Sequence, residues 1–221
     1  MVVEVALVAA AVMVCGIGVS AVRAFRSRHV AVARKLAAAE RIAVADFPDG
    51  AEAMIVGRVV VGQSELRGPL TDAPCVYFRL LVERHARVGQ EPEVLLESGE
   101  GVDFLVEDDS GCARVRVAGA TVSLVKHPVD WREAVARGID AQVPADRREG
   151  TSPSRMSFFE GRLDEGELVA VRGKGRWEIA SQAGVGAGYR KPPQQLVLRA
   201  PLAISDRPFD SAARTTASEA G

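Results

Sequence analysis

An uninterrupted run of uncharged residues near the N-terminus, Val5 to Val22, constrains this chain more than any other feature. At a rise of about 1.5 Å per residue, a helix over this run spans roughly 27 Å, close to the roughly 30 Å hydrocarbon thickness of a bilayer. A cleaved signal peptide needs a basic segment before its apolar run, but this chain begins Met-Val-Val-Glu. A buried core helix is the other alternative, and core helices rarely run this long without a polar residue. The run therefore predicts a transmembrane anchor over residues 1–24.

The charges beside this run predict the side of the membrane on which the rest of the chain lies. Only Glu4 and the terminal amine precede the run. Five basic residues follow it closely: Arg23, Arg26, Arg28, Arg34 and Lys35. Positive charge collects on the cytoplasmic side of membrane helices. We therefore expect a single-pass protein of the cell membrane with its folded domain in the cytoplasm.

Two further segments flank the expected domain. Residues 25–48 are predicted to form a helical juxtamembrane stalk, because 23–45 is rich in Ala and Arg and lacks both Gly and Pro. The stalk is expected to stop at Phe47-Pro48-Asp49-Gly50. Residues 207–221 contain too few apolar residues to pack and are predicted to be disordered.

Residues 49–206 have the pattern of a mainly β domain. Cys112 to Val117 alternates apolar and polar residues with the period of two that a half-buried strand shows. Seven β-branched runs separated by turn residues predict strands: 53–62, 75–86, 102–107, 112–119, 168–173, 176–180 and 195–204. We expect a small antiparallel barrel or sandwich, of which an OB-like barrel is one form.

The connections between these runs give more local predictions. Glu107 to Gly111 and Leu163 to Gly166 are predicted hairpin turns, with Gly111 suited to positive φ. Gly173-Lys174-Gly175 is predicted to be a turn between strands. Gly184 to Gly188 is predicted to be a flexible connection, because the prolines that follow it cannot open the helix of a dinucleotide-binding loop. Residues 126–156 are predicted to be a partly mobile excursion.

Within that excursion, Trp131 to Gly138 is predicted to form a short helix, whereas Asp146 to Ser154 is charged and rich in turn residues.

No residue pattern predicts catalysis or metal binding. The three histidines, His29, His85 and His127, form no HExxH or CxxH spacing with other ligands, and the chain has no CxxC and no GxSxG. We therefore assign no catalytic, cofactor-binding or metal-binding residue and expect no cofactor. The balance of 28 basic against 29 acidic residues argues against a broad nucleic-acid-binding face.

The cysteines are interpreted as structural. Cys15 lies in the apolar run, so Cys75 and Cys112 are the one pair that could form a disulfide within the folded part. Two small buried residues are the favoured interpretation. Cys75 opens an apolar strand, where burial raises the pKa of a thiol and suppresses its reactivity.

Four segments, taken in order, resemble a known family. They are 57–79, with the distinctive stretch Pro-Leu-Thr-Asp-Ala-Pro-Cys-Val-Tyr-Phe-Arg over 69–79, then 104–111, 158–173 and 201–205. Their order and spacing resemble the GIDE domain, also called BAM for "beside a membrane", which occurs in a mitochondrial RING-type ubiquitin ligase. The resemblance covers roughly residues 50–206. It implies a β-rich domain next to a bilayer, on the side equivalent to the bacterial periplasm, opposite to the side predicted by the flanking charges.

The resemblance also implies the label of a RING-type E3 ubiquitin transferase. Those ligases carry a second membrane helix and a RING, and three cysteines with three histidines are too few for the RING zinc ions. We expect a membrane-anchored protein-interaction or scaffold module with an unidentified protein partner. The alternatives are a transferase that uses Cys75 or Cys112, and a barrel that holds a small ligand inside.

Overall fold

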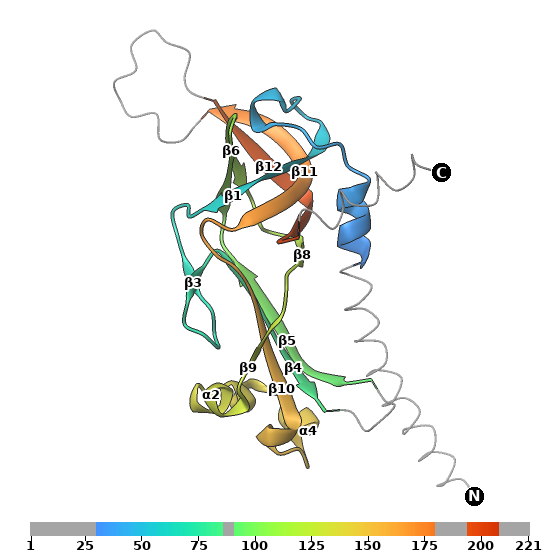
Figure 1. The fold of residues 1–221 in the computed structure, drawn as a ribbon, viewed down its shortest axis with the longest axis vertical. Coiled ribbons are helices and arrows are strands. Elements are labelled where there is room, and N and C mark those ends of the chain that lie inside the picture. Colours follow the sequence, from blue (N-terminus) through green and yellow to red (C-terminus); the bar gives the residue numbers. More distant parts are fainter. Residues whose placement is uncertain (1–29, 86–90, 180–193, 208–221) are drawn as a thin grey trace, which may run out of the picture.

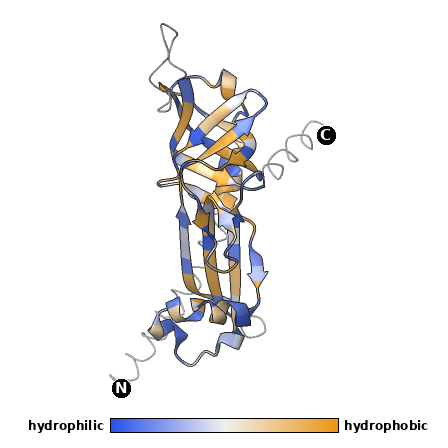
Figure 2. Ribbon diagram, turned by 90° about the vertical axis from the view of Figure 1, so that its left-hand side faces the viewer, coloured by the Kyte–Doolittle hydropathy of each residue, from blue (hydrophilic) through white to orange (hydrophobic). Residues whose placement is uncertain are grey.

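A computed structural model describes residues 30–85, 91–179 and 194–207 of the chain. A barrel forms one end of an elongated molecule, a second sheet extends from it, and short helices lie at the far end (Figures 1 and 2). The predicted anchor over residues 1–24, the glycine-rich connection 184–188 and residues 208–221 of the predicted tail lie outside the described residues. None of the helices in the described ranges has the length and apolar character needed to cross a bilayer.

The barrel is closed by five strands, so the chain is mainly β as predicted. In their order around the barrel they are β1 (Glu52–Val60), β6 (Phe104–Asp108), β7 (Gly111–Val115), β12 (Gln194–Ser205) and β11 (Leu168–Ile179). β11 pairs with β1 and closes the ring. A short strand, β8 (Thr121–Ser123), adds to the end of β12. The expectation of an antiparallel barrel is partly correct: β12 runs antiparallel to β11 but parallel to both β7 and β8.

The interior of the barrel is filled with apolar side chains. Ala113 and Val115 of β7 are fully buried, whereas Arg114 and Arg116 between and after them point outward, which confirms the predicted alternation. The largest of the fully buried side chains in this core are Phe104, Ile55, Leu163, Leu196 and Leu198. Burying each of them contributes about 1.5–3 kcal/mol to folding. Packing of this kind argues against a small ligand inside the barrel.

A four-stranded antiparallel sheet extends from the barrel. Its order is β5 (Glu93–Gly101), β4 (Tyr77–Arg84), β10 (Met156–Leu163) and β9 (His127–Val129). A two-stranded ribbon, β2 (Leu66–Arg67) and β3 (Pro74–Cys75), leads into β4. In sequence, β2 to β5 are inserted between barrel strands β1 and β6, and β9 and β10 are inserted between β8 and β11. Both insertions therefore build the same extension.

Short helices cover the far end of this sheet (Figure 1). They are α2 (Trp131–Ala136), α3 (Ile139–Gln142), α4 (Ala145–Arg148) and the 3-10 turn η2 (Pro153–Arg155). α2 begins after Asp130, whose side chain accepts a hydrogen bond from the Arg132 backbone N–H at 2.7 Å, as an N-cap does. Buried Ala134 and Ile139 pack in one core with Phe158 of β10. The predicted helix over 131–138 is confirmed, but 126–156 forms a packed cap and the edge strand β9 where a mobile excursion was expected.

The predicted helical stalk over 25–48 is only partly correct. Residues 30–37 are helical and pack on the outside of the barrel, with Val32 and Leu36 buried. The chain then turns, and the Ile42 N–H donates to the Met54 carbonyl at 2.9 Å. A 3-10 turn, η1 (Val44–Asp46), follows. Val44 and Phe47 enter the barrel core, and burying them outweighs the helical preference of this Ala-rich segment.

The predicted turn at Gly173 to Gly175 is wrong, because β11 runs through it without a break. These glycines serve close packing: a Cβ on Gly173 would lie 2.4 Å from Leu202 Cδ2, and one on Gly175 would lie 2.3 Å from Phe47 Cε1. The turn ending at Gly166, which has φ +78°, is confirmed, and so is the β6–β7 hairpin. Gly111 does not adopt the positive φ that was expected of it.

Candidate functional site

The most distinctive stretch of the sequence wraps around one buried carboxylate. Glu160 of β10 is only 1% exposed. The backbone N–H of Leu70 donates to Glu160 Oε1 at 2.8 Å, and the Thr71 hydroxyl donates to Oε2. Both oxygens of the carboxylate are therefore held by the loop between β2 and β3. We call this arrangement, made of residues 68–75 with Glu160 and Arg162, the loop clasp.

Gly68 is needed at the base of the loop clasp. A Cβ at this position would lie 2.8 Å from each oxygen of Glu160 and 2.9 Å from Cδ of Arg162. The loop is also tied to itself, since the Asp72 N–H donates to the Gly68 carbonyl at 2.8 Å and Asp72 has φ +56°. Only glycine lets the backbone approach the carboxylate this closely.

Arg162 extends the clasp toward the surface. Its Nη1 lies 3.3 Å from Glu160 Oε2 and also contacts the Thr71 hydroxyl. Its Nε and Nη2 bind the two oxygens of Asp164 at 3.1 and 2.9 Å, a bidentate arrangement. The hydrogen bonds that Arg162 donates to Asp164 are the main reason that the pKa of Arg162 lies above its usual value. The buried charge of Glu160 is thus paired and hydrogen-bonded, which is what a buried carboxylate requires.

The chemistry that the loop clasp can perform is limited by this pairing. A general base needs a lone pair aimed at a substrate proton. Each Glu160 oxygen instead faces donors of its own chain, and the side chain is buried. The clasp therefore fixes the path of the chain from β2 into β4.

Neither described cysteine has the environment of a nucleophile. Cys75 is 1% exposed, and burial, followed by the negative charge of Asp164, raises the pKa of its thiol to about 11. Cys112 is half-buried on β7, and burial likewise raises the pKa of its thiol. Both are free thiols, so the disulfide that the sequence left open is not formed. The interpretation of Cys75 as a structural residue agrees with its burial.

The histidines of the described ranges lie apart from this clasp. His85 and His127 are both exposed, one at the end of β4 and the other at the start of β9. In the part of the chain that the structure describes, no group of three or more His, Cys, Asp or Glu side chains is arranged to hold a metal ion.

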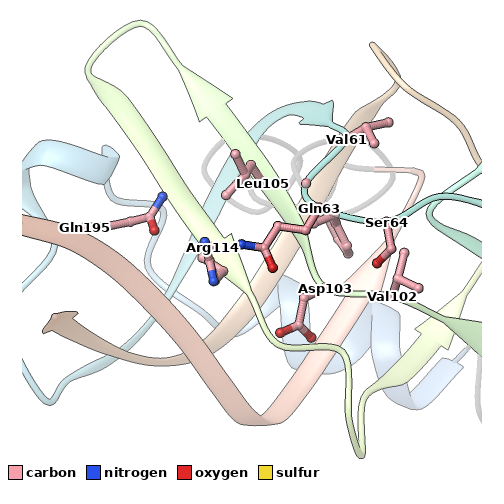
Figure 3. A pocket seen from close by; sticks show the side chains of 10 residues that line it. Val61, Gln63, Ser64, Val102, Asp103, Leu105, Arg114 and Gln195 are labelled. Atoms are coloured by element: carbon pink, nitrogen blue, oxygen red, sulfur yellow. The ribbon is translucent and has the colours of Figure 1, made fainter. Parts of the chain in front are cut away.

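A hollow of about 530 Å³ opens at the rim of the barrel (Figure 3). It lies between the chain that leaves β1, the start of β6, the middle of β7 and the start of β12. Polar side chains line it: Gln63, Ser64, Asp103, Arg114 and Gln195. Val61, Val102 and Leu105 supply apolar surface. We call it the rim hollow; no sequence pattern pointed to it, because its walls come from four separate segments.

Arg114 is the charged group that distinguishes the rim hollow. Its side chain is half-buried and lines the hollow together with Gln63 (Figure 3). Among the described residues it forms neither a hydrogen bond nor an ion pair. The facing carboxylate, Asp103, already accepts a hydrogen bond from the Val117 N–H at 3.2 Å. An unpaired guanidinium beside amide donors suits a carboxylate or another planar acceptor.

A second hollow, of about 590 Å³, lies where the barrel meets the extension. Its walls include Arg79 and Glu97, which form an ion pair with each other, and Tyr77. Arg79 is 9% exposed, and its charge is balanced by Glu97 within the chain. This hollow offers less to a partner than the rim hollow does.

Comparisons of the chain with protein-family models, with curated proteins and with solved structures gave no match.

Proposed function

We propose that this chain is a membrane-tethered β domain that binds a protein partner, with the rim hollow as the binding surface. The observation that carries the proposal is the half-buried Arg114, which has no partner among the residues that the structure describes, in a hollow with both polar and apolar walls. Binding sites combine apolar surface with a few placed polar groups in this way. The loop clasp, in contrast, has its charges satisfied internally and acts as the rigid support of the extension.

We further propose that the barrel is OB-like. In support of this, the strands that follow one another around the barrel are the first, second, third, fifth and fourth in sequence, with a parallel pair between the third and fifth. OB barrels bind ligands on the face of the second and third strands and at the loop that follows the first. The rim hollow lies at β6, β7 and the chain after β1, which are the corresponding elements.

We also propose membership of the GIDE, or BAM, group of domains that lie beside a membrane. In support of this, two of the segments that carry the resemblance, 69–79 and 158–164, meet in the loop clasp. Residues of the first segment bind the Glu160 carboxylate of the second. The tether is the predicted anchor over residues 1–24, and the charges that follow it favour the cytoplasmic side.

A transferase role receives less support. A transferase cysteine must form a thiolate that an incoming thioester can reach. Cys75 is buried with a pKa of about 11, and burial also raises the pKa of Cys112. We therefore do not propose ligase activity.

Site-specific photo-crosslinking in the full chain tests the proposed binding surface. A photo-reactive residue is placed at Gln63 in the rim hollow or, as a matched control, at exposed Glu133 on α2. We expect one protein to be captured from Gln63 and not from Glu133, and Arg114→Glu to abolish that capture. Capture that is equal at the two positions, or that is unaffected by Arg114→Glu, would overturn the proposal.

A further inference from the structure

Two opposite charges lie in the rim hollow without neutralising each other. Arg114 is the register partner of Leu105, and Asp103 lies two residues before Leu105. Phe104 between them is 1% exposed, so its two neighbours point away from the core, to the side of the sheet on which Arg114 lies. Among the described residues, Arg114 and Asp103 form no ion pair with each other or with any other side chain.

The spacing of these two charges matches an extended chain. Asp103 directly precedes β6, so it is diagonal to Arg114 across the β6–β7 pair. Diagonal residues on paired strands have Cα atoms about 7–8 Å apart. Alternate residues of an extended segment point to one side and are about 6.4–6.8 Å apart. A partner segment with an acid and a base two positions apart can therefore place one of them beside each charge.

The cation that follows Arg114 on the same side of the chain already has a partner. Arg116 Nη2 lies 3.6 Å from Glu178 Oε2, so Glu178 balances the charge of Arg116. Asp103 Oδ1 accepts the Val117 N–H at 3.2 Å, and in the described residues Oδ2 has no hydrogen bond. The second oxygen of this carboxylate is therefore open to a cation of the partner.

The other walls of the rim hollow suit a peptide backbone. Gln63 and Gln195 each carry an amide that can both donate and accept a hydrogen bond. An added extended segment presents N–H and C=O groups along its edge, which need partners of both kinds. Val102 and Leu105 supply apolar surface for the aliphatic parts of its side chains.

Other ligands fit these charges less well. A phosphate group or a nucleic acid carries negative charge alone, which Asp103 would repel. A free α-amino acid has both charges, but they are attached to one carbon atom and lie closer together than the diagonal spacing of Asp103 and Arg114. The pair of charges therefore favours a segment of a protein.

We propose that the partner of the rim hollow presents an extended segment with an acidic and a basic residue two positions apart, the acid bound by Arg114 and the base by Asp103. This assignment rests on the proposed function, which makes the rim hollow the protein-binding surface. Arg114 should contribute more to binding than Asp103, because Arg114 is half-buried whereas Asp103 is exposed and its charge is screened by water.

The test measures the binding of labelled peptides to the full chain in lipid nanodiscs by fluorescence anisotropy. The probe is the peptide Thr-Val-Glu-Val-Lys-Val-Thr. In its isomer, Thr-Val-Glu-Lys-Val-Val-Thr, the two charges are adjacent and so point to opposite sides of an extended chain. We expect the probe to bind at least about fivefold more tightly than the isomer, and high salt to reduce this preference.

Variants of the chain assign the two contacts. Arg114→Gln should weaken binding of the probe about tenfold and Asp103→Asn about threefold, while the asparagine keeps an acceptor for the Val117 N–H. Arg114→Gln should have no effect on a probe whose Glu is replaced by Gln, and Asp103→Asn none on a probe whose Lys is replaced by Gln. The controls are Arg137→Gln and Asp109→Asn, at exposed positions outside the hollow, which should leave binding unchanged.

Three results would overturn the proposal: equal affinities for the probe and its isomer, no binding of the probe at millimolar concentration, or an effect of Arg114→Gln that does not depend on the Glu of the probe. A dimer of the full chain that depends on Arg114 and forms in place of peptide binding would also overturn it. The proposed function would still stand if a protein were captured from Gln63 and lost in Arg114→Glu. Absence of that capture together with a preference for the probe would overturn the proposed function alone.

Discussion

Leu70 and Glu160 lie 90 residues apart in sequence, and the backbone N–H of the first donates to the buried carboxylate of the second at 2.8 Å. This bond joins the loop before β4 to β10, the strand that pairs with β4 along its whole length. The two insertions that build the extension are therefore locked together where they leave the barrel. The consequences of this lock can be measured.

Removing the Glu160 carboxylate should destabilise the protein strongly. Glu160→Ala leaves the Leu70 N–H and the Thr71 hydroxyl without their acceptor in a buried place. We expect a loss of about 2–4 kcal/mol in the free energy of unfolding, measured by urea titration of the full chain in detergent with tryptophan fluorescence. Glu165→Ala, at an exposed turn position, should change it by less than about 0.5 kcal/mol. Similar losses for both variants would contradict the account of the clasp.

Gly68→Ala should destabilise the same clasp by a steric route. The new methyl would meet both Glu160 oxygens at 2.8 Å, so the loop must move away from the carboxylate. We expect a loss of about 1–3 kcal/mol in the same titration. Gly111→Ala is the control, since its nearest neighbour would be a Val44 methyl at 3.3 Å. A smaller loss for Gly68→Ala than for Gly111→Ala would show that the loop is not held as described.

The Cys75 thiol should react slowly in the folded protein. Its pKa is raised from 9.0 to about 11, so at neutral pH the folded state has about a hundredfold less thiolate than the unfolded chain. Alkylation with iodoacetamide, followed by mass spectrometry, should therefore be at least about a hundredfold slower in buffer than in urea. Because the folded pKa is the higher one, this thiol favours folding below about pH 9 and loses that contribution as pH rises toward 11. Equal alkylation rates in buffer and urea would contradict the burial of Cys75.

Asp206 should lower stability at neutral pH. Burial raises the pKa of its carboxyl, and Oδ1 is buried without a hydrogen-bond partner, while Oδ2 accepts from the Val125 N–H at 2.6 Å. The pKa of nearby Glu167 is raised as well, first by burial and in part by the charge of Asp206. A carboxyl with a raised folded pKa binds its proton more tightly in the folded state, so its penalty is present at neutral pH and disappears as pH falls through that pKa.

Asp206→Asn should therefore unfold at a higher temperature than the unaltered chain at neutral pH. The difference should shrink as the pH is lowered through the raised pKa of the Asp206 carboxyl, because the unaltered side chain then takes up its proton. Scanning calorimetry at several pH values measures it. Asp109→Asn, in the β6–β7 turn where the side chain is exposed, is the control and should show no such trend. A difference that grows on acidification would show that the pKa shift has the opposite sign.

The tether and its direction can be tested in membranes that contain the full chain. We expect the chain to resist alkaline extraction and a variant lacking residues 1–24 to be released. The basic residues after the apolar run predict that an external protease cannot reach the domain in intact spheroplasts. Cleavage from outside would show that the domain lies on the opposite side, as the GIDE resemblance implies.

Some of this architecture could be predicted from local sequence, and some could not. The alternation around Ala113 and Val115 predicted a barrel strand, because the buried face of a strand can be recognised from the apolar and polar residues of that strand alone. β10 was missed, since it contains Glu160 and Gly161, residues of low β-propensity whose places depend on partners from distant segments. The rim hollow was missed because its walls come from four segments that are distant in sequence. The continuation of β11 through Gly173 and Gly175 was also missed, because these glycines pack closely against Leu202 and Phe47, which lie elsewhere in the sequence.

The most direct test of the proposed function is the dissociation constant between the full chain in lipid nanodiscs and the protein captured through Gln63. Arg114→Glu reverses a charge in the wall of the rim hollow, while Cys75→Ser alters a buried residue that is not among the lining residues. We predict that Arg114→Glu weakens binding at least about tenfold, which is about 1.4 kcal/mol, and that Cys75→Ser leaves it unchanged. An unchanged constant for Arg114→Glu, or binding lost in Cys75→Ser while that variant remains folded, would contradict the account.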